Sequence, residues 1–129
     1  MSRIANLLLF PQVERDFTNY FTNRVSALEC AEPIVLLEGG FEREMRIEGE
    51  ERGTVPVEVL VVRDVDADAE AVVVALEQRI RHGAWERTGE AWPYRVVGLD
   101  TTAPAFRERD GSGRFVWAFM VTVTVVRTV

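Results

Sequence analysis

The carboxylates of the segment DVDADAE are the densest group of chemically active side chains in this chain. Asp64, Asp66 and Asp68 stand at alternate positions and Glu70 follows, which is the residue type that a calcium loop requires. A calcium loop also needs a glycine at its sharp turn and a distal glutamate, and the segment has neither. Negative charge is also favoured in the first turn of a helix. We therefore expect a helix start here and no metal site.

Other candidates for catalysis stand alone in the sequence. Cys30 is the single cysteine, which excludes an internal disulfide and is typical of a reducing compartment. His82 is the single histidine, and it falls at the end of a predicted helix, where a cation is stabilised by the helix dipole. Nucleophile motifs and glycine-rich phosphate loops are absent from the sequence. The sequence predicts no catalytic residue, no metal and no cofactor, and hence a protein that is not an enzyme.

The aromatic residues leave one alternative open. Trp85 and Trp92 fall in a predicted loop over residues 83–93, where they would either cover the core or form a contact surface. With Tyr94 and Trp117 they could instead line a pocket for a small ligand, with Arg95 as its polar anchor. That alternative is a small-ligand-binding α+β domain.

Length and charge limit the class of protein. A chain of 129 residues with 47% hydrophobic residues predicts a single domain over residues 1–129. No apolar run approaches the roughly 20 residues of a membrane-spanning helix, so we expect no membrane contact. The net charge of −6 argues against binding to nucleic acid through its phosphates. It is compatible with a surface that DNA passes without binding.

The segment that organises the chain is a strand followed by a helix. Side chains alternate along a strand, so the strand predicted over residues 55–62 places four valines on one face. Asp66 is predicted to be the N-cap of a helix over about 67–82, and Gly83 its C′ residue. One apolar stripe should face the sheet from this helix. Its members are Ala69, Val72, Val73, Leu76 and Ile80.

The remaining elements are placed by turn residues and alternation. We expect an N-terminal helix from Val13 on, because apolar residues recur at helical spacing up to Leu28. Strands are predicted over 34–37 and 41–48, joined as a hairpin at Gly39-Gly40, with an exposed connection over 48–54. A strand over 94–99 is followed by an edge segment over 101–110, a turn over 110–113 and a strand over 114–126.

The predicted fold class is α+β. We expect a mixed, mainly antiparallel sheet, with the N-terminal helix and the second helix packed on it, and a long C-terminal β-hairpin. The final strand is about twice the usual length and apolar on both faces, which favours a partner subunit. We expect the hairpin contact with that partner to be formed by Arg114, Phe115, Trp117 and Phe119. Arg107 and Arg109 would pair with acidic groups of a neighbour.

The order of these elements resembles that of phage tail terminator proteins, also called tail-completion or head–tail joining proteins. The similarity lies in the strand VEVLVVRD, which leads through a short loop to the helix DADAEAVVVALEQRI. It continues in the arm over 101–109, the turn over 110–113 and the long strand over 114–126. The tryptophan-containing loop has no counterpart in this scheme.

This resemblance implies a structural role in a virion. Members of the family form rings, commonly hexamers, at the head-proximal end of the tail tube, where they stop tube polymerisation and meet the head connector. DNA passes through the ring without specific binding, and no cofactor takes part. The implied partners are further copies, tube proteins and connector proteins, in the virion and, during assembly, in the host cytoplasm. Another tail or injection-system adaptor is the alternative within this class.

Overall fold

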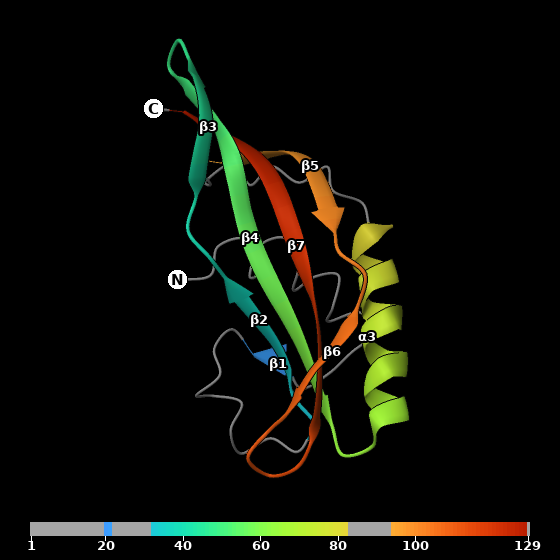
Figure 1. Ribbon diagram of the computed structural model, residues 1–129. Coiled ribbons are helices and arrows are strands. Elements are labelled where there is room, and N and C mark those ends of the chain that lie inside the picture. Colours follow the sequence, from blue (N-terminus) through green and yellow to red (C-terminus); the bar gives the residue numbers. More distant parts are fainter. Residues whose placement is uncertain (1–19, 22–31, 83–93, 129) are drawn as a thin grey trace.

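The computed structural model describes residues 20–21, 32–82 and 94–128. These residues form a seven-stranded sheet and a helix (Figure 1). The strands are β1 (Tyr20–Phe21), β2 (Ile34–Glu38), β3 (Glu42–Ile47), β4 (Glu50–Arg63), β5 (Tyr94–Thr101), β6 (Ala105–Arg109) and β7 (Phe115–Thr128), and the helix is α3 (Asp66–Arg81). The strand order is β1-β2-β4-β7-β5, with β3 also on β4 and β6 also on β7. A mixed, mainly antiparallel sheet is therefore confirmed.

Strands β4 and β7 are the axis of the sheet. They pair antiparallel without interruption from Glu50 opposite Thr128 to Arg63 opposite Phe115. At about 3.3 Å per residue, such a 14-residue strand spans roughly 45 Å. The described residues therefore form a long, narrow sheet (Figure 1). The predicted length of the final strand and the closing β6–β7 hairpin are both confirmed.

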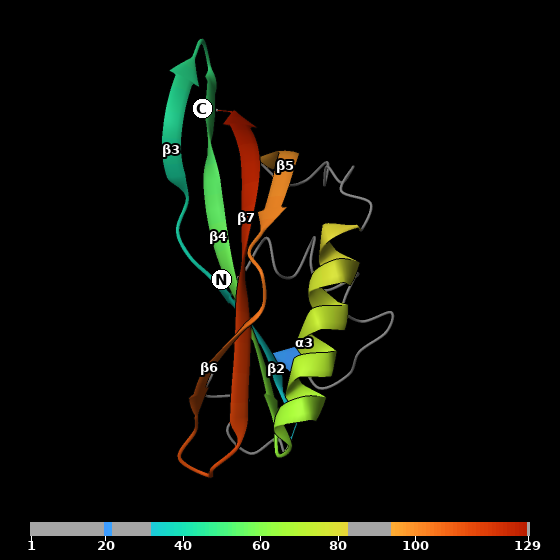
Figure 2. The same ribbon diagram turned by 45° about the vertical axis from the view of Figure 1, so that its right-hand side comes forward.

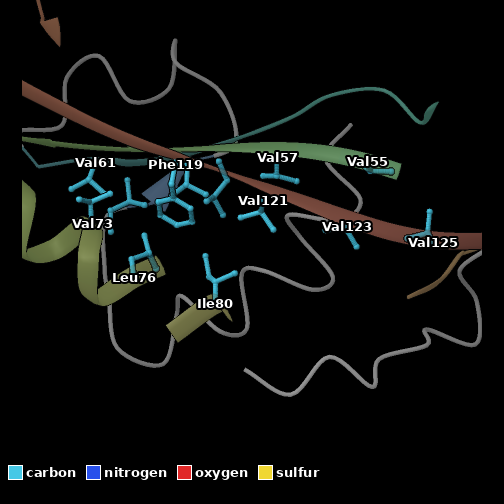
Figure 3. Packing of buried hydrophobic residues seen from close by; sticks show 13 residues of the cluster. Val55, Val57, Val61, Val73, Leu76, Ile80, Phe119, Val121, Val123 and Val125 are labelled. Carbon is cyan, nitrogen blue, oxygen red and sulfur yellow. The ribbon is translucent and has the colours of Figure 1, made fainter. Parts of the chain in front are cut away.

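Helix α3 covers one face of this axis (Figure 2). The alternating valines of β4 and the odd-numbered residues of β7 form one buried cluster with Val73, Leu76 and Ile80 of α3, the predicted stripe. Val55, Val123 and Val125 lie past the Ile80 end of α3 (Figure 3). Figure 3 shows Phe119 between the two strands and the helix, beside Val73 and Leu76. Burial of apolar surface is the main favourable term in folding, so this layer stabilises the fold. The chain therefore covers this face of its own long strand.

The neighbour of β4 changes along its length. Strand β2 pairs with the half of β4 near Arg63, and β3 pairs with the other half. The predicted hairpin at Gly39-Gly40 is therefore wrong, because β2 and β3 both pair with β4 instead of with each other. Pro56 lies at the changeover, where its carbonyl accepts the Gly39 N–H at 2.7 Å. In an antiparallel strand the N–H and C=O of one residue point to the same side, so an N–H at position 56 would also point toward Gly39. Proline has no N–H, and its place at the gap between β2 and β3 means that no strand partner is left without a donor.

Residues 42–54 form a hairpin arm, hereafter the arm, made of β3, a turn and the first residues of β4. The turn contains Gly49, whose φ of 77° suits glycine. The predicted exposed connection over 48–54 is wrong from Glu50 on, because these residues pair with both β3 and β7. Figures 1 and 2 show that the arm extends beyond the end of α3. It therefore leaves the helix-covered body as a projection.

The caps of α3 differ from the prediction. Val65 is the N-cap and makes no side-chain capping bond, and Asp66 is the first helical residue. The prediction of Asp66 as N-cap is wrong, because its carboxylate instead accepts a hydrogen bond from Trp117. His82 is the C-cap, and Gly83 lies outside the described residues.

The N-terminal region is described at two residues. Tyr20–Phe21 form β1 and pair parallel with Ile34 and Val35 of β2. The predicted helix is wrong at these two positions, where aromatic residues with high β-propensity extend the sheet. The rest of that predicted helix lies outside the described residues, as do Trp85 and Trp92.

Candidate functional site

Three aromatic rings lie together at the end of the sheet formed by the β6–β7 hairpin. Phe106 of β6 stands opposite Trp117 of β7, with ring centroids 6.1 Å apart in an edge-on arrangement. Phe106 is also 6.4 Å from the ring of Phe115. Phe106 is 49% exposed, and the other two rings are half-buried. We name these three residues the aromatic surface, which is an exposed apolar patch beside the start of α3.

A hydrogen bond fixes the aromatic surface to the helix. The indole Nε1 of Trp117 donates to Oδ1 of Asp66 at 2.8 Å, and the Trp117 ring packs against the main core. Val65, directly before Asp66, is 53% exposed and adds apolar area next to the carboxylate. The site thus combines exposed apolar surface with negative charge.

Arg109 forms the other border of this surface. Its guanidinium lies 4.7 Å from the centroid of the Phe115 ring, which is cation–π geometry. The same side chain donates to the Gly113 carbonyl from Nε at 3.1 Å and from Nη2 at 2.9 Å. Arg109 therefore holds the turn and the ring in a fixed relation.

The turn of the hairpin is organised by Asp110. Its Oδ1 accepts the backbone N–H groups of Ser112 at 3.0 Å and Arg114 at 2.9 Å, and its Oδ2 accepts Nε of Arg114 at 2.7 Å. Partial burial alone would raise the pKa of Asp110, but the hydrogen bonds from Arg114 and Ser112 outweigh it and lower that pKa below 3.8. The ionised carboxylate therefore stabilises this turn.

The Asp110→Asn variant should be less stable than the wild type by about 1 kcal/mol at neutral pH, because it loses the charged partner of Arg114. The pKa is lowered by folding, so this contribution is present above the ordinary value of 3.8 and is lost as pH falls through the folded value. Urea unfolding of both proteins at pH 7 and below pH 3.8 measures it. A difference that persists unchanged at the lower pH would contradict this account.

The six predicted contact residues fall into three groups in the structure. Phe115 and Trp117 belong to the aromatic surface, and Arg109 borders it. Phe119 is 2% exposed within the core under α3, so it offers no surface to another copy, and its expected contact role is corrected. The remaining two predicted contact residues, Arg107 and Arg114, form ion pairs within the chain.

The partners of Arg114 and Arg107 are carboxylates of the same chain. Arg114 pairs with Asp110, and Arg107 pairs with Glu58 on the sheet face opposite α3. The predicted pairing of Arg107 with a neighbouring copy stays a prediction, since nearly half of its side chain is exposed.

Phe106 and Val65 are the residues of this site that sequence reasoning missed. The sequence did contain a signal for Phe106. If the two strands of a hairpin are paired outward from the turn over 110–113, the segment AFRER lies alongside the start of β7. The irregularity between Phe106 and Glu108 shifts that count by one residue, which obscures the pairing with Trp117. Val65 carries no comparable signal, because an isolated valine in a loop is common.

Two hollows on the described residues bear on the predicted ligand pocket. One, of about 300 Å³, has an apolar floor of Val35, Leu60, Val62 and Val116 on the face opposite α3. The other, of about 320 Å³, lies beside Glu58 and Met120. Trp117 lines neither of them. The tryptophan-lined pocket therefore gains no support from these two hollows.

The described residues also bear on metal binding and on membrane crossing. Within residues 20–21, 32–82 and 94–128, no three histidine, cysteine or acidic side chains are grouped so that they could hold a metal ion. The segment DVDADAE instead leads into α3. Among these same ranges, no helix has the length and apolar character that a membrane crossing requires.

Comparison with known proteins identifies a shared fold. No protein-family model matches the chain, and no curated protein matches it. Among solved structures, a chain of the structure described as "Virion of native gene transfer agent (GTA) particle" matches with a TM-score of 0.71. The match covers 98% of this chain and 99% of that chain, at 15% sequence identity. The two chains therefore share one fold over nearly their whole length.

Proposed function

We propose that this chain is a structural protein of a phage-like virion, and within that class a tail terminator. It would form a ring at the head-proximal end of the tail tube, end tube assembly and join the tail to the head. The observation that carries the proposal is the end-to-end similarity in fold to a chain of a gene transfer agent particle. The order of elements along the sequence, which resembles that of tail terminators, supports the finer role.

The exposed aromatic surface supports assembly. Contact hot spots between proteins are enriched in tryptophan, tyrosine and arginine, and large exposed apolar side chains often mark an interface. Phe106, Trp117 and Arg109 offer this combination on a chain whose odd-numbered β7 residues from Phe119 to Val125 are buried. We propose that copies of the chain contact one another through this surface.

The remaining parts of the proposal follow from charge and from the lack of catalytic motifs. A net charge of −6 suits a ring whose lumen DNA passes without specific binding. The partners would be further copies, tube proteins and connector proteins, in the virion and in the host cytoplasm during assembly. The chain would act through its shape, without a cofactor and without an enzymatic reaction.

Assembly of the full chain tests the proposal. The chain would be examined by sedimentation velocity and negative-stain electron microscopy, alone at high concentration and with tail tubes assembled from the tube protein of the same virion. We expect annular particles several times heavier than the 14.6 kDa chain, bound to the head-proximal end of the tubes and limiting their length. A monomer under all these conditions, with tube length unchanged, would overturn it. Binding at the baseplate end would favour another tail adaptor.

Phe106→Ser should weaken self-association at least tenfold while it leaves folding nearly intact. The side chain is half-exposed in the single copy, so its removal should change the free energy of unfolding by less than about 1 kcal/mol. A buried aromatic contact commonly contributes more than about 1.4 kcal/mol to association, which is tenfold in affinity. Val97→Ser on β5 is the control, because Val97 is exposed to a similar degree. Sedimentation equilibrium of both variants measures the effect, and equal dissociation constants would contradict this role.

A further inference from the structure

The arm carries a second charged surface, on the same face of the sheet as α3. Glu51 is 5% exposed at its centre, with Arg46 of β3 and Arg127 of β7 directly opposite it in register. Arg43 Nη1 lies 3.3 Å from Glu51 Oε2, and Arg127 Nη2 lies 3.3 Å from Oε1. One buried carboxylate thus pairs with two guanidinium groups, and a third arginine stands opposite it in register. This face of the arm has a surplus of positive charge, which we name the basic face.

The acidic residues of the arm lie mainly elsewhere. Glu42 is opposite Thr54, and Glu50 is opposite both Ile47 and Thr128, so both glutamates point to the other face of the sheet. Glu48 is in the turn at the tip, and Glu44 is at the irregularity of β3. The basic face therefore sets Arg43, Arg46 and Arg127 against the single buried carboxylate of Glu51.

The basic face and the aromatic surface lie at opposite ends of the sheet. The arm projects past the C-terminal end of α3, whereas the aromatic surface lies beside the first turn of α3 (Figures 1 and 2). The β4–β7 axis that separates them spans roughly 45 Å, so the two surfaces of one copy cannot meet. Any contact between them joins two copies.

The chemistry of the two surfaces is complementary. An arginine guanidinium stacks on aromatic faces and pairs with carboxylates. The aromatic surface offers both, since Asp66 is bound to Trp117 and Glu70 lies one helical turn further along the exposed side of α3. The chain already uses this chemistry twice, with Arg109 4.7 Å from the Phe115 ring centroid and Arg127 4.1 Å from that of Phe41.

We propose that the arm of one copy docks on the aromatic surface of the next, with Arg43 and Arg46 against Phe106, Asp66 and Glu70. The side chains of both arginines are accessible for this, since Arg43 is 57% exposed and Arg46 is exposed. The inference rests on the proposed function, because it specifies how copies assemble. Two different surfaces then form a head-to-tail contact, which closes into a ring when the rotation per copy allows it.

Directed disulfide formation tests the contact. One protein carries Arg46→Cys and the other Glu70→Cys, each with Cys30→Ser, and the two are mixed under mild oxidation. We expect a cross-linked dimer in the mixture and none from either protein alone, because the contact joins unlike surfaces. Met45→Cys replaces Arg46→Cys in the control, since Met45 is half-exposed on the opposite face of the arm. Cross-linking of Met45→Cys equal to that of Arg46→Cys would overturn the proposal.

Charge reversal separates this inference from the function on which it rests. Arg43→Glu with Arg46→Glu should abolish association, and adding Asp66→Arg and Glu70→Arg to the same chain should restore part of it. Rings that form equally well with the reversed arm would overturn the arm contact and leave the virion role intact. Open filaments built through the arm would support the contact and contradict the ring. The same reversed-arm variant would be tested for duplex DNA binding in a gel-shift assay. If it assembles like the wild type but no longer binds DNA that the wild type binds, the basic face is assigned to nucleic acid and the contact is overturned.

Discussion

Leu76→Ala should lower the free energy of unfolding by about 2–5 kcal/mol, the range for truncating a fully buried leucine. Leu76 is 0% exposed and lies in the centre of the layer between α3 and the two long strands, beside Val73 and Phe119 (Figure 3). Alanine would leave a cavity that strands paired along their whole length cannot collapse to fill. Urea unfolding followed by circular dichroism measures the loss.

Val74→Ala is the matched control on the same helix. Val74 is 39% exposed, so its truncation removes little buried area and should change the free energy of unfolding by less than about 0.5 kcal/mol. If both variants lost the same stability, α3 would not pack on β4 and β7 through the buried side of Leu76. A Leu76 variant as stable as the wild type would contradict the core described above.

The burial of β7 within one copy revises the physical reason for assembly. The sequence suggested that the final strand is too apolar for one copy to cover. In the structure Phe119, Val121, Val123 and Val125 are all buried within the single copy. Among the described residues, the exposed large apolar side chains include Phe106 and Val65 at the end of the sheet near the start of α3. The case for association therefore depends on this local patch and no longer on the full length of β7.

Periodicity predicted the elements that bury side chains. The alternating valines of β4 and the stripe of α3 could be identified because burial imposes a period of 2 on strands and 3.6 on helices. Helix α3 begins and ends within one residue of the prediction. Within the candidate site, Phe115 and Trp117 followed from the same alternation.

The arm could not be predicted in this way, because its strands bury few side chains. The segment EERGT has the polar composition of a loop. Its backbone nevertheless pairs with β3 on one side and with β7 on the other. The partner of β2 was also missed, since Gly39-Gly40 is a strong hairpin signal and nothing local shows that Pro56 marks a change of neighbour. Pairing between distant segments is set by the whole sheet and leaves no local pattern.

Gly53→Val should destabilise the protein by about 3 kcal/mol, because the chain approaches itself too closely at this position for any side chain. A Cβ atom on Gly53 would overlap the backbone carbonyl oxygen of Glu42 and lie 2.7 Å from Cζ of Phe41. Backbone atoms held in a three-strand ladder cannot move aside as a flexible side chain can. We therefore expect the pairing of β3 with β4 to open at this point, and with it the arm.

The control is Gly40→Ala in the same region of the chain. A Cβ atom there meets nothing within 4 Å, so the variant should be as stable as the wild type or more stable by up to about 1 kcal/mol, since alanine restricts the unfolded chain. Thermal unfolding of both variants gives the stability. Amide hydrogen exchange over residues 42–54 shows whether the loss is in the arm. A Gly53→Val protein with wild-type stability and protected arm amides would mean that the close approach of β3 to β4 is absent.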